Sequence, residues 1–132
     1  MPDPIIRELS DVPQMDPGSP TPQVTWNALA PLLLAYQLPD DSTATIAFDL
    51  GLACKIGPPN DETLHGHPLY AFGLSHYAAS EVLNSPWLAE IRERNRVHDS
   101  HSDAMFDKFR HFIWTFHDET FECLAQSYRL II

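Results

Sequence analysis

Histidine is the residue whose abundance first suggests chemistry, with seven copies in a chain of 132 residues. An imidazole can bind a transition metal or carry a proton near neutral pH. The densest group of potential metal ligands is Asp61, Glu62, His65 and His67. Carboxylate and imidazole ligands suit zinc, nickel or iron, and an extended His-x-His pair points both rings the same way. These residues are therefore candidate ligands of a divalent transition metal, and His76 or His111 could complete the site.

The same segment also has the composition of a polar surface loop. Its spacing matches no established metal motif, and a Gly-Pro-Pro-Asn-Asp run precedes the histidines. In this interpretation His67 caps a helix that begins at Pro68. We favour the polar loop, and a metal-binding protein or metal-dependent enzyme remains an alternative.

A second group of potentially catalytic residues lies near the carboxyl end. His117, Thr115 and Glu122 fall on one face of two strands that we expect to pair, with Thr115 opposite Glu122. His111 shares that face, but six residues of strand put it about 20 Å from His117, too far for both to meet one substrate atom. His117 and Glu122 are thus the candidate catalytic residues. The alternative, which we favour, is a solvated cross-strand polar group.

Nothing else in the sequence has the form of a catalytic centre. Cys54 and Cys123 fall on faces predicted to be buried, where a thiol behaves as a small hydrophobe rather than as a nucleophile. No serine occupies a Gly-x-Ser-x-Gly turn, and 5 glycines leave little room for a phosphate-binding loop. The chain is therefore expected not to be an enzyme.

The clearest structural element is a predicted hairpin over residues 111–130. Apolar and polar residues alternate on both sides of Asp118-Glu119. If those two residues form the loop, Phe116 faces Phe121 and Trp114 faces Cys123. This register places every aromatic side chain of the hairpin on one buried face.

The rest of the chain predicts one more strand and several helices. Unbroken alternation favours a single long strand over residues 45–56, although Gly51 could mark a bulge or a turn. Helical spacing predicts helices over 25–37, 68–83 and 86–96, and Ser102 is expected to cap a short further helix. The expected fold class is α+β, with an antiparallel sheet of three or more strands, including the C-terminal hairpin, and three to four helices packed mainly on one face.

The first 23 residues differ in composition from the rest, because they contain six prolines. Proline at this density fixes φ and removes amide donors, so neither helix nor strand should propagate there. We expect residues 1–23 to form an extended arm and residues 24–132 to form a single domain.

Charge limits the partners that the protein can have. The chain carries 18 acidic and 8 basic residues, a formal net charge of −10. Such a charge repels phosphate backbones and anionic lipids, so neither nucleic acid nor a membrane is an expected partner. Five basic residues between Arg92 and Arg110 are interpreted as a solvated helix face. The amino terminus lacks the basic start and apolar run of a secretory signal, which predicts a cytoplasmic protein.

These observations favour a small acidic interaction module that binds a protein partner. Charge complementarity would favour a basic partner, as for inhibitors and immunity proteins of toxic nucleases, and this comparison rests on charge alone. One alternative is the metal-dependent function described above. The other is a small-ligand binder with an aromatic pocket, lined by Trp87, Trp114, Tyr70 and Tyr77.

Overall fold

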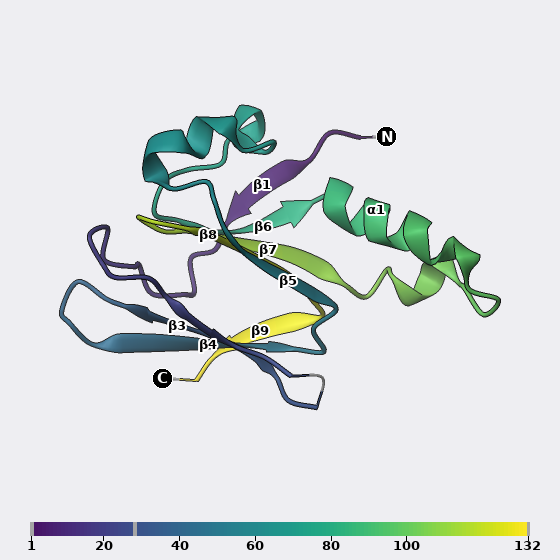
Figure 1. Ribbon diagram of the computed structural model, residues 1–132, viewed down its shortest axis with the longest axis horizontal. Helices are drawn as coiled ribbons and strands as arrows, with labels where there is room; N and C mark the ends of the chain where they lie inside the picture. The colour runs from purple at the N-terminus through teal and green to yellow at the C-terminus, as the bar shows by residue number, and fades with distance from the viewer. Residues whose placement is uncertain (1, 28, 132) are drawn as a thin grey trace.

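The fold consists of two antiparallel β-sheets that face each other, as the computed structural model of residues 2–27 and 29–131 shows (Figure 1). The five-stranded sheet has the order β1 (Ile5–Glu8), β6 (Ala79–Leu83), β7 (Arg110–Thr115), β8 (Thr120–Ala125) and β5 (Ala53–Gly57). The four-stranded sheet has the order β2 (Gln23–Thr25), β3 (Leu32–Gln37), β4 (Thr43–Asp49) and β9 (Ser127–Leu130).

Short helical segments lie on the outer side of the five-stranded sheet and beyond one end of it (Figure 1). They are the 3₁₀ segments η1 (Asp61–Gly66), η2 (Tyr70–Phe72), η3 (Asn95–Val97) and η4 (Asp103–Met105), and the α-helix α1 (Pro86–Arg94). None of these described helices has the length and apolar character needed to span a bilayer. An apolar cluster joins the η1–η2 region to this face of the sheet and consists of Leu64, Leu69, Leu74, Val82 and Ile113.

The main core lies between the two sheets. Phe48 on β4 places its ring 5.4 Å from that of Trp114 on β7, centroid to centroid. It also lies 5.7 Å from the rings of Phe112 and Phe121. Because the five-stranded sheet is covered on both sides, nearly every residue of β7 and β8 is buried. Polar residues on the outer face of these strands must therefore find partners within the protein.

The predicted C-terminal hairpin is confirmed up to Ala125, but its register differs by two residues. Its predicted end is wrong, because residues 127–130 form β9 and pair with β4 in the other sheet. The loop is residues 116–119, closed by Phe116 N–H donating to the Glu119 carbonyl at 2.9 Å, and Trp114 lies opposite Phe121. A two-residue loop would need positive φ at both positions, for which Asn-Gly or Asp-Gly is favoured. Because the shift is an even number of residues, the aromatic side chains still share the buried face.

The single long strand predicted over residues 45–56 is wrong. β4 ends at Asp49, β5 begins at Ala53, and the two strands belong to different sheets. Leu50 turns the chain with a φ of 55°. Gly51 lies against the Trp26 ring, where an added Cβ would come within 3.4 Å of the indole. Phe48 on β4 and Cys54 on β5 both contact the main core, whereas Leu50 and Ile56, which continue the alternation, are exposed.

Two of the predicted helices are wrong. In place of the helix predicted over 25–37, β2 ends at Thr25 and β3 spans Leu32–Gln37. The helix predicted over 68–83 is replaced by η2 and β6. In β3 burial alternates, with Leu32, Leu34 and Tyr36 facing the core. Apolar residues in this segment fit both the helical and the strand period, and packing between the sheets decides between them.

The helix predicted over residues 86–96 is confirmed as α1. Ser85 caps it by accepting a hydrogen bond from Leu88 N–H at 3.0 Å, and Pro86 occupies its first position. The helix expected after Ser102 is the 3₁₀ turn η4. The fold is therefore α+β but mostly β. In the described chain it has two sheets and one α-helix, where a sheet with three to four helices was expected.

Residues 1–23 were predicted to form an extended arm, and the described residues 2–23 contribute to both the sheet and the core. The expectation that no strand forms there is wrong, because β1 pairs with β6 at the edge of the five-stranded sheet. Residues 5–12 contain no proline, so this stretch keeps its amide donors. Met15 is 1% exposed and belongs to the main core.

Candidate active site

A buried carboxylate, Glu122, lies at the centre of a polar network on the outer face of the five-stranded sheet. Its Oε1 accepts a hydrogen bond from Nε2 of His111 at 2.8 Å, and its Oε2 accepts one from Nε2 of His67 at 2.9 Å. All three side chains are at most 7% exposed. Nζ of Lys55 lies 3.8 Å from the same Oε2.

Sheet register and one turn bring these residues together. Glu122 on β8 lies opposite Ile113 on β7 and opposite Lys55 on β5, so His111 is its diagonal neighbour on the same face. His67 directly follows η1 and reaches the sheet from above it. The network therefore depends on the pairing of three strands and on the end of η1.

The protonation of this network follows from its hydrogen bonds and burial. Burial alone would raise the pKa of the Glu122 carboxyl, but the hydrogen bonds from His111 and His67 outweigh it and lower that pKa to about 2. Burial lowers the pKa of His111, although its hydrogen bond with Glu122 acts in the opposite direction. At neutral pH an uncharged His111 thus lies beside an ionised Glu122.

The tautomers of both histidines are fixed by their second ring nitrogens. Nδ1 of His67 accepts a hydrogen bond from Leu69 N–H at 3.0 Å, so the proton of this ring is on Nε2, which faces Glu122. His111 also directs Nε2 at the carboxylate, which can only accept. Its Nδ1 therefore accepts, and the hydroxyl of Ser85 donates to it at 2.7 Å.

Ser85 joins the network at a sharp strand-to-helix connection. β6 ends at Leu83, Asn84 adopts a left-handed conformation with a φ of 55°, and Ser85 is the N-cap of α1. The positive end of the helix dipole is thus placed at this serine. Leu88 N–H donates to Oγ, which orients the hydroxyl proton toward His111.

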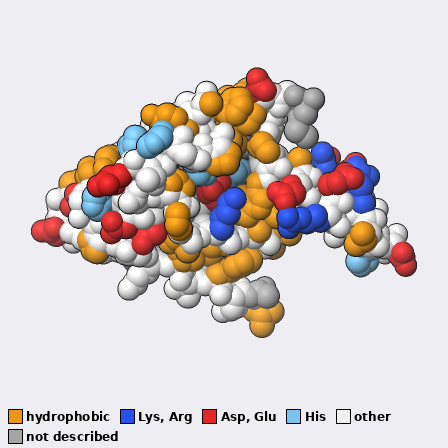
Figure 2. Space-filling model, turned by 45° about the horizontal axis from the view of Figure 1, so that its top comes forward, with side chains coloured by type: hydrophobic (Ala, Val, Ile, Leu, Met, Phe, Trp, Pro, Cys, Tyr) orange, Lys and Arg blue, Asp and Glu red, His pale blue; other side chains and the backbone are white. Residues whose placement is uncertain are grey.

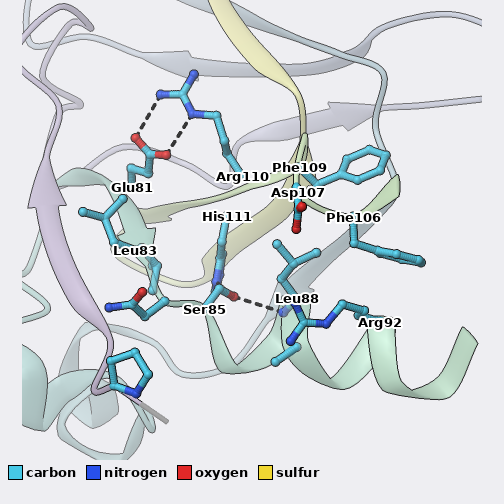
Figure 3. Close-up of a pocket in the computed structure, with 14 residues that line it drawn as sticks. Glu81, Leu83, Ser85, Leu88, Arg92, Phe106, Asp107, Phe109, Arg110 and His111 are labelled. Atoms are coloured by element: carbon cyan, nitrogen blue, oxygen red, sulfur yellow. Dashed lines mark hydrogen bonds and ion pairs between the residues drawn. The ribbon is translucent and has the colours of Figure 1, made fainter. Parts of the chain in front are cut away.

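Ser85 and His111 both line a cavity of about 430 Å³ (Figure 3). Its apolar walls come from Leu88 on α1 and from Phe106 and Phe109 near the start of β7. Arg92, also on α1, extends along the same cavity (Figure 3). The partly exposed Ser85 and the buried His111 thus adjoin a space that can hold a small molecule.

A second cavity of about 210 Å³ lies on the other side of His111 and reaches Glu122 and His67. The Trp87 ring packs edge-on against the His111 ring at 5.2 Å, and Nζ of Lys55 lies 4.3 Å above the Trp87 ring. These contacts hold the imidazole in place from the side opposite the strand. Of the residues predicted to form an aromatic pocket, Trp87 lines this cavity, whereas Trp114 is fully buried in the main core.

The predicted metal ligands separate into different contacts. His67 binds Glu122, whereas Asp61 accepts hydrogen bonds from the Tyr77 hydroxyl and from Nδ1 of His117. Glu62 and His65 are exposed. Within residues 2–27 and 29–131, no group of three or more His, Cys, Asp or Glu side chains is arranged to hold a metal ion.

The predicted catalytic pair is also separated. His117 lies in the β7–β8 loop beside Asp61, and its pKa is raised by that hydrogen bond. Glu122 instead pairs with His111 and His67. Sequence reasoning missed Ser85 as a reactive group. It considered His111 as a metal ligand and as a partner of His117, and it rejected the second role because of the distance along the strand. The signal that could have found them is the Ser-Pro helix start next to a strand, combined with a histidine on the outer face of β7.

Comparison of the chain with family models, curated proteins and solved structures finds no match.

The charged network predicts that acid destabilises the protein. The pKa of Glu122 is about 2 in the folded protein and 4.5 for an ordinary glutamate. As the pH falls from above 4.5 toward 2, the unfolded chain therefore binds a proton at this residue before the folded chain does, and the folded state loses stability. The lowered pKa of His111 acts in the same direction below pH 6.5. We expect Glu122 to contribute about 3 kcal/mol at neutral pH and to lose about 2 kcal/mol of this between pH 6 and pH 3.

Urea denaturation of the wild type and of Glu122→Gln at pH 6 and pH 3 measures this effect. The variant should lose less stability than the wild type over that range. Glu93→Gln, which removes an exposed carboxylate, should keep the wild-type dependence. Equal pH dependence in the wild type and in Glu122→Gln would contradict the assignment.

Proposed function

We propose that this protein is a hydrolase that transfers an acyl group from a carboxylic ester to Ser85. The observation that carries the proposal is the unbroken hydrogen-bond chain from Glu122 through His111 to Ser85, which ends at a cavity. A nucleophile, a general base and a carboxylate that orients the base are the three parts of this chemistry.

Each group has a defined role in the first step. Oγ of Ser85 attacks the carbonyl carbon, and its proton moves to Nδ1 of His111. The imidazolium that forms is stabilised by the ionised Glu122 at Nε2. The amino terminus of α1 favours the negative charge on the tetrahedral intermediate. His111 then protonates the departing alkoxide, and an ester of Ser85 remains.

The second step regenerates the serine. Water enters from the cavity and attacks the Ser85 ester, while Nδ1 of His111 takes the proton from that water. Collapse of this intermediate breaks the bond to Oγ, and His111 returns its proton to the serine. The products are one carboxylic acid and one alcohol, and no metal or redox cofactor is consumed.

Covalent labelling tests the proposal directly. An alkyl fluorophosphonate should phosphonylate wild-type Ser85 with loss of fluoride, which intact-protein and peptide mass spectrometry detect. Ser85→Asn should not be labelled, although asparagine keeps the helix cap and so preserves the fold. Ser102→Ala, a change in the serine before η4, should be labelled like the wild type. A wild-type protein that is not labelled at Ser85 would refute the proposal.

Protein binding is the second candidate function. The net charge of −10 is one observation in its favour. The other is a group of three exposed apolar side chains: Trp26 and Leu29 lie in the loop after β2, and Leu50 lies at the corner between β4 and β5. Leu29 is 98% exposed and Leu50 is 66% exposed. This function needs no reactive serine, so folded protein that resists the fluorophosphonate would favour it.

We propose a cytoplasmic location for either function. Cys54 and Cys123 are directly opposite each other on β5 and β8, and both are free thiols. Opposed residues of neighbouring strands lie within the Cα separation that a disulfide can bridge. Free thiols at such a position are typical of a reducing compartment.

A further inference from the structure

Arg92 differs from the other arginines of the described chain because it has no carboxylate partner. Its Nε is buried and donates to no group of the described residues. Each of the other arginines lies within 4 Å of a carboxylate oxygen, and these are Arg7, Arg94, Arg96, Arg110 and Arg129. The residue as a whole is partly exposed, so the end of its guanidinium group remains open to an anionic ligand.

The unpaired arginine faces the cavity of the proposed nucleophile. Ser85, Leu88 and Arg92 are separated by three and four residues, so they share one face of α1. All three line the 430 Å³ cavity, and Figure 3 shows the Arg92 side chain beside Leu88, with Ser85 at the start of the same helix. The Cα atoms of Ser85 and Arg92 are seven residues apart on the helix, a distance of about 10 Å. Helical side chains lean toward the amino terminus, which brings the Arg92 side chain closer to Ser85. A small substrate can therefore reach both groups.

Neighbouring carboxylates do not neutralise Arg92. Glu81 lines the same cavity, but its oxygens bind Nε and Nη2 of Arg110 at 2.8 and 2.9 Å and also bind Arg7. Asp107 lines the cavity and forms no ion pair with Arg92 in the described residues. Figure 2 shows most of the Lys and Arg side chains of this face toward one end, where Asp and Glu side chains lie among them.

We propose that Arg92 binds a carboxylate of the substrate, so that the site selects esters that carry a second, ionised carboxyl group. This inference rests on the proposed function of Ser85. The planar guanidinium fork matches a carboxylate with two parallel hydrogen bonds. A carboxylate carries one negative charge, so Asp107 in the cavity wall repels it less than it would repel a doubly charged phosphate. The side chains of Leu88, Phe106 and Phe109 would contact the carbon chain between the two ends.

Kinetics with matched esters tests the selectivity. Monomethyl succinate and methyl butyrate have the same number of acyl carbons, and only the first carries a carboxylate. The wild type should prefer monomethyl succinate in kcat/KM. Arg92→Gln should reduce this preference by about 10- to 100-fold, mainly through KM, as expected for the loss of a charged hydrogen bond. Arg94→Gln, which removes an arginine paired with Glu90 on the surface, should keep the preference.

A binding measurement separates failure of this inference from failure of the proposed function. Succinamate, a carboxylate that carries an amide, should bind the non-acylating Ser85→Asn variant more tightly than butyramide does in NMR titrations. Adding Arg92→Gln should weaken succinamate binding by about 10-fold or more. Succinamate binding that requires Arg92 without ester turnover would support the arginine site and refute the hydrolase. Turnover of both esters with no effect of Arg92→Gln would refute the arginine site alone.

Discussion

Replacement of Glu122 by glutamine is expected to lower kcat/KM for ester hydrolysis by about 10³- to 10⁴-fold, as for other enzymes in which the base loses its correct tautomer. The reason lies in His67, whose Nδ1 accepts from Leu69 N–H and whose Nε2 must therefore donate. A glutamine would give its single carbonyl oxygen to His67 and turn its NH₂ group toward His111. His111 would then accept at Nε2, carry its proton on Nδ1 and donate to Ser85, so it could not act as the base.

A pH profile distinguishes this effect from a loss of structure. In the wild type, kcat/KM should rise with pH through an ionisation below 6.5 and then level off, because His111 must be neutral to accept the serine proton and its pKa is lowered. That ionisation should be absent or shifted in Glu122→Gln. Glu90→Gln, at a carboxylate that lines the cavity beside Trp87, should keep the wild-type rate and profile. A fall of less than 10-fold in Glu122→Gln would mean that Glu122 does not position His111.

Replacement of Phe48 by alanine is expected to reduce the free energy of unfolding by about 3–5 kcal/mol. Phe48 is fully buried, and it is the residue of the four-stranded sheet that contacts the rings of Phe112, Trp114 and Phe121. Removal of the ring leaves a cavity between the two sheets, because the strands are too tightly packed to move in and fill it. Urea denaturation followed by tryptophan fluorescence measures the change, since Trp114 is one of the contacted rings.

A graded series checks that the loss comes from packing. Phe48→Leu should cost clearly less than Phe48→Ala, because leucine fills most of the space. Leu29→Ala, at a side chain that is 98% exposed, should leave stability within about 0.5 kcal/mol of the wild type. A loss below 1 kcal/mol in Phe48→Ala would contradict the packing of the two sheets around this ring.

The sequence was informative where two local signals agreed. Ser85 followed by Pro86 marks a helix start, and α1 begins there. The aromatic alternation around residues 111–125 correctly predicts two paired strands with one buried aromatic face. Both elements depend on contacts that are close in the sequence, so capping chemistry and side-chain alternation are enough to identify them.

Long-range contacts explain most of what the sequence did not reveal. β3 and β6 were mistaken for helices because a few apolar residues satisfy both periods, and pairing with β4 and with β7 makes them strands. The second sheet was missed because the apolar alternation runs through the turn at Leu50, and Gly51 alone did not outweigh it. Local propensity gives way to packing in such segments.

The site was misassigned for a reason that the register makes clear. The two-residue loop predicted at Asp118-Glu119 placed Thr115 opposite Glu122, near His117. In the observed register Ile113 lies opposite Glu122, which brings the carboxylate to His111 instead. Ser85 and His67 come from other parts of the chain, and no local pattern could have joined them to this strand.

The two-sided burial of β8 has a consequence for how substrate enters. Phe121 and Cys123 on this strand face the main core, and Glu122 faces the polar network. The strand is therefore packed on both of its faces. The oriented carboxylate thus belongs to a layer that is packed on both faces. We therefore expect the movements that admit or release a small molecule to occur in α1, which has no fully buried residue, and not in the sheet.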